Sequence, residues 1–180
     1  SARTALAATG YGTDKAIFAY GNTGSRVSLS NLVSNSGVVA SDVTGVGTAR
    51  DSLAAAGFGT DKAIFGYGGT GSNSSLTNLV SSSGVVASDV TGVGSARRLL
   101  AAAGYGGDKA IFCYGYADGR TAVTNLVSNS GVVGSDVTGV GTVRNGLAAA
   151  GYDRDKAIFG YGEDASSALS LTNLVSSSGV

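Results

Sequence analysis

The chain has 180 residues, of which 43% are hydrophobic and 13% are charged, and this composition excludes an intrinsically disordered chain. Twelve basic residues balance twelve acidic ones. A neutral chain lacks the positive field that non-specific binding to nucleic acid or to an anionic membrane requires, so we expect neither partner. No apolar run approaches the roughly 20 residues of a membrane-spanning helix, which excludes insertion by such a helix.

One unit occurs four times along the sequence, at a spacing of 47 residues. Its most regular part is Asp-Lys-Ala-Ile-Phe, found at Asp14–Phe18, Asp61–Phe65, Asp108–Phe112 and Asp155–Phe159. Periods of this length are typical of propellers, solenoids and arrays, in which neighbouring units bury the surface that one unit leaves exposed. We therefore expect a single repetitive domain over residues 1–180, with repeats at approximately 1–38, 39–85, 86–132 and 133–180.

The second copy illustrates the elements expected in every repeat. Leu53–Phe58 is a short apolar run, and the turn Gly59–Asp61 ends it. Lys62–Tyr67 follows with the alternation and the aromatic content of a strand, and Leu76–Ser82 and Val85–Val90 alternate in the same way. About four short strands joined by tight turns make up one blade of a β-propeller. We predict an all-β fold of four propeller blades, with a β-solenoid as the alternative.

The same copy resembles a degenerate kelch-type blade. The resemblance rests on Arg50, the run Leu53–Ala56, the turn Thr60–Asp61, the strand Ala63–Gly68 and the strand Leu76–Val80. Kelch blades place an arginine before the innermost strand and end the second strand in a paired glycine, here interrupted as Gly-Tyr-Gly. The tryptophan that is usual on the outer kelch strand is missing. The resemblance implies a propeller with a binding surface, and it implies no particular activity.

The copies are also similar to repeats of bacteriophage tail-fibre and other virion-surface proteins, because they are rich in alanine, glycine, serine, threonine and valine. This second resemblance implies an extracellular or virion-surface location. It also implies a structural or adhesive role.

The last repeat is expected to lack its final strand. Val39–Gly47 has counterparts at Val86–Gly94 and Val133–Gly141, and none follows Val180. Leu171–Ser178 would then be an unpaired sheet edge, which is a site for pairing with another chain. We expect either a segment of a longer repeat array or a homo-oligomer in the form of a ring or fibre.

Charges that recur in every copy are expected to be structural. The arginines before the inner strands would hydrogen-bond carboxylates or carbonyls of the neighbouring blade, and the turn aspartates would accept backbone N–H groups within their turns. A ring of four identical ligand subsites is the functional alternative. These recurring positions are Arg3, Arg50, Arg97, Arg144, Asp14, Asp61, Asp108 and Asp155.

One stretch varies freely between copies, and it is where recognition is expected. It covers Asn22–Ser28, Gly69–Ser75, Tyr116–Ala122 and Glu163–Leu169. Loops on a rigid scaffold normally carry binding residues, although a solvated loop under no selection would vary as freely. An aromatic ring beside charged hydrogen-bonding groups suits a sugar or a peptide. The candidate ligand-binding residues are Arg26, Tyr116, Asp118, Arg120, Glu163 and Asp164.

The sequence lacks the residues that most enzymes of known type require. It contains no histidine, so it excludes histidine-based catalytic triads and disfavours a zinc site. Its Gly-x-Gly triplets lack a phosphate-binding lysine and a following helix pattern. Cys113, the single cysteine, cannot form an internal disulfide and is expected to be a small packed residue. We expect no enzyme, no metal site and no cofactor.

Two functional hypotheses follow. The first is a structural and adhesive module of an extracellular or virion-surface assembly, with contacts through the variable loops. The second is a carbohydrate-binding propeller of the lectin type, with weak sites strengthened by multivalency. An intracellular kelch-type scaffold that binds a peptide fits less well, because the sequence has no strongly charged patch.

Overall fold

A computed structural model describes residues 1–180 as four antiparallel sheets of three strands each. Within each sheet the strand order follows the chain, and each sheet comes from one repeat. The strands are β1 (Ala7–Tyr11), β2 (Lys15–Ala19), β3 (Ser30–Val33), β4 (Ala54–Phe58), β5 (Lys62–Gly66), β6 (Thr77–Val80), β7 (Ala101–Tyr105), β8 (Lys109–Cys113), β9 (Thr124–Val127), β10 (Ala148–Tyr152), β11 (Lys156–Gly160) and β12 (Thr172–Val175). No helix of the structure is long and apolar enough to cross a membrane.

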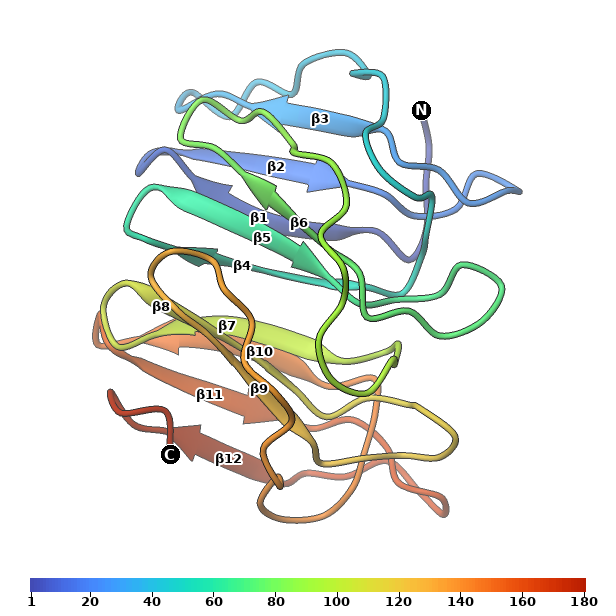
Figure 1. The fold of residues 1–180 in the computed structure, drawn as a ribbon, viewed down its shortest axis with the longest axis vertical. Helices are drawn as coiled ribbons and strands as arrows, with labels where there is room; N and C mark the ends of the chain where they lie inside the picture. Colours follow the sequence, from blue (N-terminus) through green and yellow to red (C-terminus); the bar gives the residue numbers. More distant parts are fainter.

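The four sheets follow one another along the long axis of the molecule (Figure 1). The first sheet lies at one end, and the sheet of β10, β11 and β12 lies at the other, so the structure is an open stack in which no closed ring is seen. The first strand of each sheet packs against the first strand of the next. The predicted all-β repeat fold is confirmed at this level.

In the first three repeats, three of the four predicted strands are present and the fourth is not continuous, and the last repeat has the three strands expected of it. In the second repeat, Val85–Val90 joins β6 only through isolated bridges, from Val86 to Val80 and from Val90 to Thr77. Between these bridges the Asn78 side chain donates a hydrogen bond to the carbonyl oxygen of Ala87 at 2.9 Å. The segment is therefore held partly by a side chain, and Val85 remains 65% exposed.

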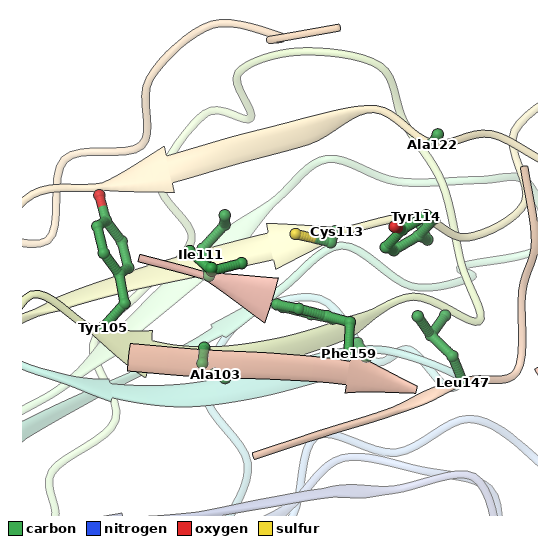
Figure 2. Close-up of a cluster of buried hydrophobic side chains, with 11 residues drawn as sticks. Ala103, Tyr105, Ile111, Cys113, Tyr114, Ala122, Leu147 and Phe159 are labelled. Carbon is green, nitrogen blue, oxygen red and sulfur yellow. The ribbon is translucent and has the colours of Figure 1, made fainter. Parts of the chain in front are cut away.

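The hydrophobic core is divided into three clusters, and each cluster lies between two successive repeats. Figure 2 shows the cluster between the third and fourth repeats, where Cys113 and Tyr114 lie near Phe159 of β11. Cys113 is buried as predicted, and burial raises the pKa of its thiol. Because every cluster needs residues from two repeats, a single repeat has no complete core of its own.

The same three side chains meet at each of these interfaces. At the interface of the second and third repeats, the Tyr67 ring meets Phe112 edge-on, with a centroid distance of 5.1 Å. The guanidinium carbon of Arg97 lies 4.2 Å from the centre of the same ring. Tyr20 meets Phe65 and Arg50 in the same way, and Tyr114 meets Phe159 and Arg144. We call this set the tyrosine contact.

The recurring arginines bind carbonyl and carboxylate groups, as predicted, but the carbonyl groups do not belong to the neighbouring repeat. Arg97 Nε donates to the carbonyl oxygen of Tyr114 at 2.9 Å, and Arg144 Nη2 donates to Asn173 Oδ1 at 2.7 Å. These hydrogen bonds lie within the arginine's own repeat, because the guanidinium edge faces its own sheet while its flat face covers the preceding repeat's tyrosine. The contact with the neighbour is therefore a cation–π contact in place of the expected hydrogen bond.

The residue that precedes the tyrosine differs in size among the three tyrosine contacts, and the distance between the tyrosine and phenylalanine rings increases with that size. The centroid distance is 5.1 Å beside Gly66, 5.5 Å beside Ala19 and 6.1 Å beside Cys113. A Cβ atom added at Gly66 would lie 2.6 Å from Phe112 Cζ. A larger side chain at this position therefore requires the next repeat to move away.

Replacing Gly66 with valine is expected to lower the free energy of unfolding by about 1–3 kcal/mol, because the added atoms overfill the interface. The matched control is Gly160→Val, where the nearest atom to an added Cβ is Thr172 Cγ2 at 3.3 Å. Chemical denaturation of both variants measures the difference. An equal loss in the two variants would show that the Phe112 ring does not limit the size of residue 66.

The buried tyrosines predict a loss of stability at high pH. Burial raises the pKa of Tyr20 to about 12 from an ordinary value of 10.0, despite the opposing charge of Arg50. The unfolded chain then loses this proton before the folded chain does, so the free energy of unfolding falls as the pH rises from 10 to about 12. Tyr20→Phe should make this fall shallower in denaturation curves measured across that range, whereas an unchanged slope would contradict the assignment to Tyr20.

Candidate functional site

The Asp-Lys turns of successive repeats are joined by backbone hydrogen bonds. In the first turn, Gly12 and Thr13 both have positive φ, at 59° and 70°. The Gly12 N–H donates to the carbonyl oxygen of Asp61 in the next repeat at 2.7 Å, and the two following pairs of turns repeat this bond. The Asp14 carboxylate accepts from Asn35 Nδ2 at 3.1 Å and lies 4.0 Å from Lys15 Nζ, but it accepts no backbone N–H group of its own turn. The contact between turns is made by the carbonyl groups of Asp61, Asp108 and Asp155. The prediction that the carboxylates of the turn aspartates accept backbone N–H groups of their own turns is wrong, because the hydrogen bonds they accept come from asparagine side chains.

Turns from all four repeats line one shallow groove of about 380 Å³. Its charged lining consists of four recurring lysines and Arg154, against Asp108 as the one acidic side chain. The Asp14 and Asp108 carboxylates both bind asparagine side chains, Asn35 and Asn129. The lysines of the lining are Lys15, Lys62, Lys109 and Lys156. Lys156 is paired with Asp153 and Asp155, and Lys15 lies 4.0 Å from Asp14, so acidic neighbours offset part of the positive charge.

Several of the candidate residues in the variable loops bind the next repeat. Arg26 forms an ion pair with Asp51, with Nε 3.2 Å from Oδ2. Arg120 donates from Nε to Asn145 Oδ1 at 2.9 Å and pairs with Glu163 at 3.2 Å. Both arginines thus connect one loop to the repeat that follows it, and their side chains are already engaged within the chain.

Asp164 stabilises its own loop. Its Oδ1 atom accepts hydrogen bonds from the backbone N–H groups of Ser166 and Ser167, at 2.7 and 2.9 Å. These two bonds hold the pKa of Asp164 below its ordinary value. A carboxylate used in this way is part of the loop structure.

Tyr116 and Asp118 are the two candidates that line a common hollow. The hollow has a volume of about 640 Å³ and lies between the loops of the second and third repeats. Arg98 also lines it, with its guanidinium carbon 5.7 Å from the centre of the Tyr116 ring. Asn73 Nδ2 donates to the carbonyl oxygen of Ala117 at 2.8 Å and joins the two loops beside the hollow. We call this the loop hollow.

The loop hollow combines groups that bind hydroxyl-rich or peptide ligands. Its lining offers an aromatic ring, a guanidinium group, a carboxylate and the hydroxyl groups of Ser72 and Ser95. Asp118 is exposed at the loop, and Tyr116 is half-buried. A ring that supports a ligand face, with polar groups around it, is the usual composition of a small ligand site.

Arg98 and Asn73 were missed in the sequence analysis. Arg98 directly follows the recurring Arg97, and its counterparts in the other copies are Thr4, Asp51 and Asn145. This variation between copies is the signal that could have identified Arg98 as a candidate. The position faces the variable loop of the preceding repeat, since Asp51 and Asn145 at the same position bind Arg26 and Arg120 of that loop.

No protein-family model matches the chain, and no curated protein matches it either.

Proposed function

We propose that the chain is a non-enzymatic structural and adhesive module of an extracellular or virion-surface assembly. The proposal rests on where the polar groups lie: one set is buried between the repeats, and another set is accessible in the variable loops. Three of the recurring arginines, Arg50, Arg97 and Arg144, are fully buried at the interfaces between repeats. Tyr116, Asp118 and Arg98 instead line a hollow between variable loops. A rigid repeat scaffold that presents variable loops is suited to holding a partner.

The architecture is further proposed to be a segment of a kelch-like β-propeller, with a β-solenoid as the alternative. Two features support it. Each sheet is a meander whose strand order follows the chain. The turns that follow the first strands of all four sheets line one groove, and in a propeller the innermost strands of the blades likewise surround one axis. Electron cryo-microscopy of the longest natural form of the chain tests the proposal by showing whether its blades curve around a common axis.

The role in a surface assembly is tested by locating the protein in its native source. Antibodies against the chain, detected by immunogold electron microscopy, should label the outside of intact particles or cells. Labelling that appears only after the particles or cells are opened would contradict the proposed location.

Carbohydrate binding is the second candidate function, and the loop hollow favours it. Tyr116 supplies an aromatic surface, and Arg98 and Asp118 supply charged hydrogen-bonding groups beside it. A glycan array probed with the whole chain should then show binding that Tyr116→Ala abolishes. Ser25→Ala, in the exposed loop of the first repeat, is the matched control and should leave binding unchanged. A negative array, or binding that survives Tyr116→Ala, would contradict a sugar site in this hollow.

A further inference from the structure

The two end faces of the stack resemble the two halves of the interface between repeats. Inside the stack, each tyrosine contact pairs a tyrosine of one repeat with a phenylalanine and an arginine of the next. Tyr20, Tyr67 and Tyr114 are at most 3% exposed as a result. This interface occurs three times, so it is a reliable template for what covers either half.

The face formed by the fourth repeat presents the tyrosine half. Tyr161 occupies the same position in its repeat as Tyr114, and it is 64% exposed. Its φ of 63° equals that of Tyr114, so its backbone already has the conformation found inside the stack. Leu174, on the neighbouring strand β12, is 65% exposed. An apolar surface in its binding conformation is therefore ready to receive a partner without rearrangement.

The face formed by the first repeat presents the other half. Phe18 and Arg3 line a hollow of about 550 Å³ together with Leu6 and Asn31. Arg3 hydrogen-bonds the Asn31 side chain, as Arg50 does that of Asn78. No aromatic ring lies over Arg3, in contrast to the three arginines inside the stack.

Backbone groups on the two faces also match. Inside the stack, the Gly115 N–H donates to the carbonyl oxygen of Arg144 at 3.0 Å, and the two earlier repeats repeat this bond. The counterpart donor on the fourth repeat is the Gly162 N–H, which makes no backbone hydrogen bond. The counterpart acceptor on the first repeat is the carbonyl oxygen of Arg3.

We propose that a second copy of this chain covers these faces, head to tail, with Tyr161 of one copy entering the hollow beside Arg3 and Phe18 of the next. The contact joins different surfaces of the two copies, so it is heterologous and extends into a filament or closes into a ring. It is a contact between sheet faces, distinct from pairing along the edge of β12. It does not depend on what the loop hollow binds.

Two substitutions block one face each. Tyr161→Lys places a charge on the tyrosine half, and Leu6→Lys places a charge in the hollow opposite. The mass of the wild-type chain, measured by light scattering, should rise above the 17.5 kDa of one chain as the concentration increases. Each variant alone should lose this rise and remain a monomer. Val85→Lys is the matched control, because Val85 is a 65% exposed apolar side chain of the second repeat, which forms neither end face.

Mixing the two blocked variants gives the sharpest test. Each retains one intact half, so an equimolar mixture should form a complex of twice the mass of one chain and nothing larger. Circular dichroism melting curves confirm that both variants are folded before mixing. A wild-type chain that stays monomeric at every soluble concentration would overturn the proposal. Association that persists in both single variants would also overturn it, because another surface would then be responsible.

Discussion

Replacing Arg97 with alanine is expected to lower the free energy of unfolding by about 3–5 kcal/mol. About 1–3 kcal/mol comes from buried carbonyl oxygens left without a donor, and about 2 kcal/mol from the loss of a desolvated cation–π contact. Arg97 is fully buried between the second and third repeats. Its removal leaves the carbonyl oxygen of Tyr114 without its donor and the Tyr67 ring without its cation. Urea denaturation at a concentration where the chain is monomeric measures the loss.

Arg3→Ala is the matched control for Arg97. Arg3 occupies the same position in its own repeat and bonds Asn31, but it is not fully buried and has no tyrosine ring over it. The control should lose less than half as much stability as Arg97→Ala. Equal losses would mean that the arginine matters only within its own repeat, contrary to its proposed role between repeats.

The second large effect is expected for Phe112→Ala, which should cost about 3–5 kcal/mol through lost burial and the cavity left behind. Phe112 is fully buried and meets the Tyr67 ring edge-on. Phe18→Ala removes the equivalent ring of the first repeat, where the side chain is only partly buried. Thermal and chemical denaturation of both variants should show the larger loss for Phe112. A larger loss for Phe18 would show that its ring is already covered in solution.

The repeat and its strands could be predicted from the sequence because both depend on local patterns. The alternation in Lys62–Tyr67 and the turn at Gly59–Asp61 fix a hairpin, and β4 and β5 form it. The way in which repeats stack could not be predicted in the same way. It depends on contacts between residues far apart in sequence, such as Gly66 with Phe112, and the period of 47 residues does not specify an angle between units.

Part of the candidate site could also be predicted from local patterns, but the contacts between its residues could not. Variation between copies correctly placed Tyr116 and Asp118 in loops, and the structure brings both to the loop hollow. The same variation could not show that Arg120 binds Asn145, because that partner lies 25 residues further along the chain, in the next repeat. Charges that vary between copies therefore include residues that match one repeat to its neighbour.

We infer that the tyrosine contact holds successive repeats together. A double-mutant cycle between Tyr67 and Arg97 measures this contact, with Tyr67→Leu, Arg97→Met and the double variant compared by chemical denaturation. We expect a coupling free energy of about 1–2 kcal/mol, as for a desolvated cation–π pair. A coupling below about 0.5 kcal/mol would show that the two side chains act independently and that other contacts hold the repeats together, because independent sites add to within that limit.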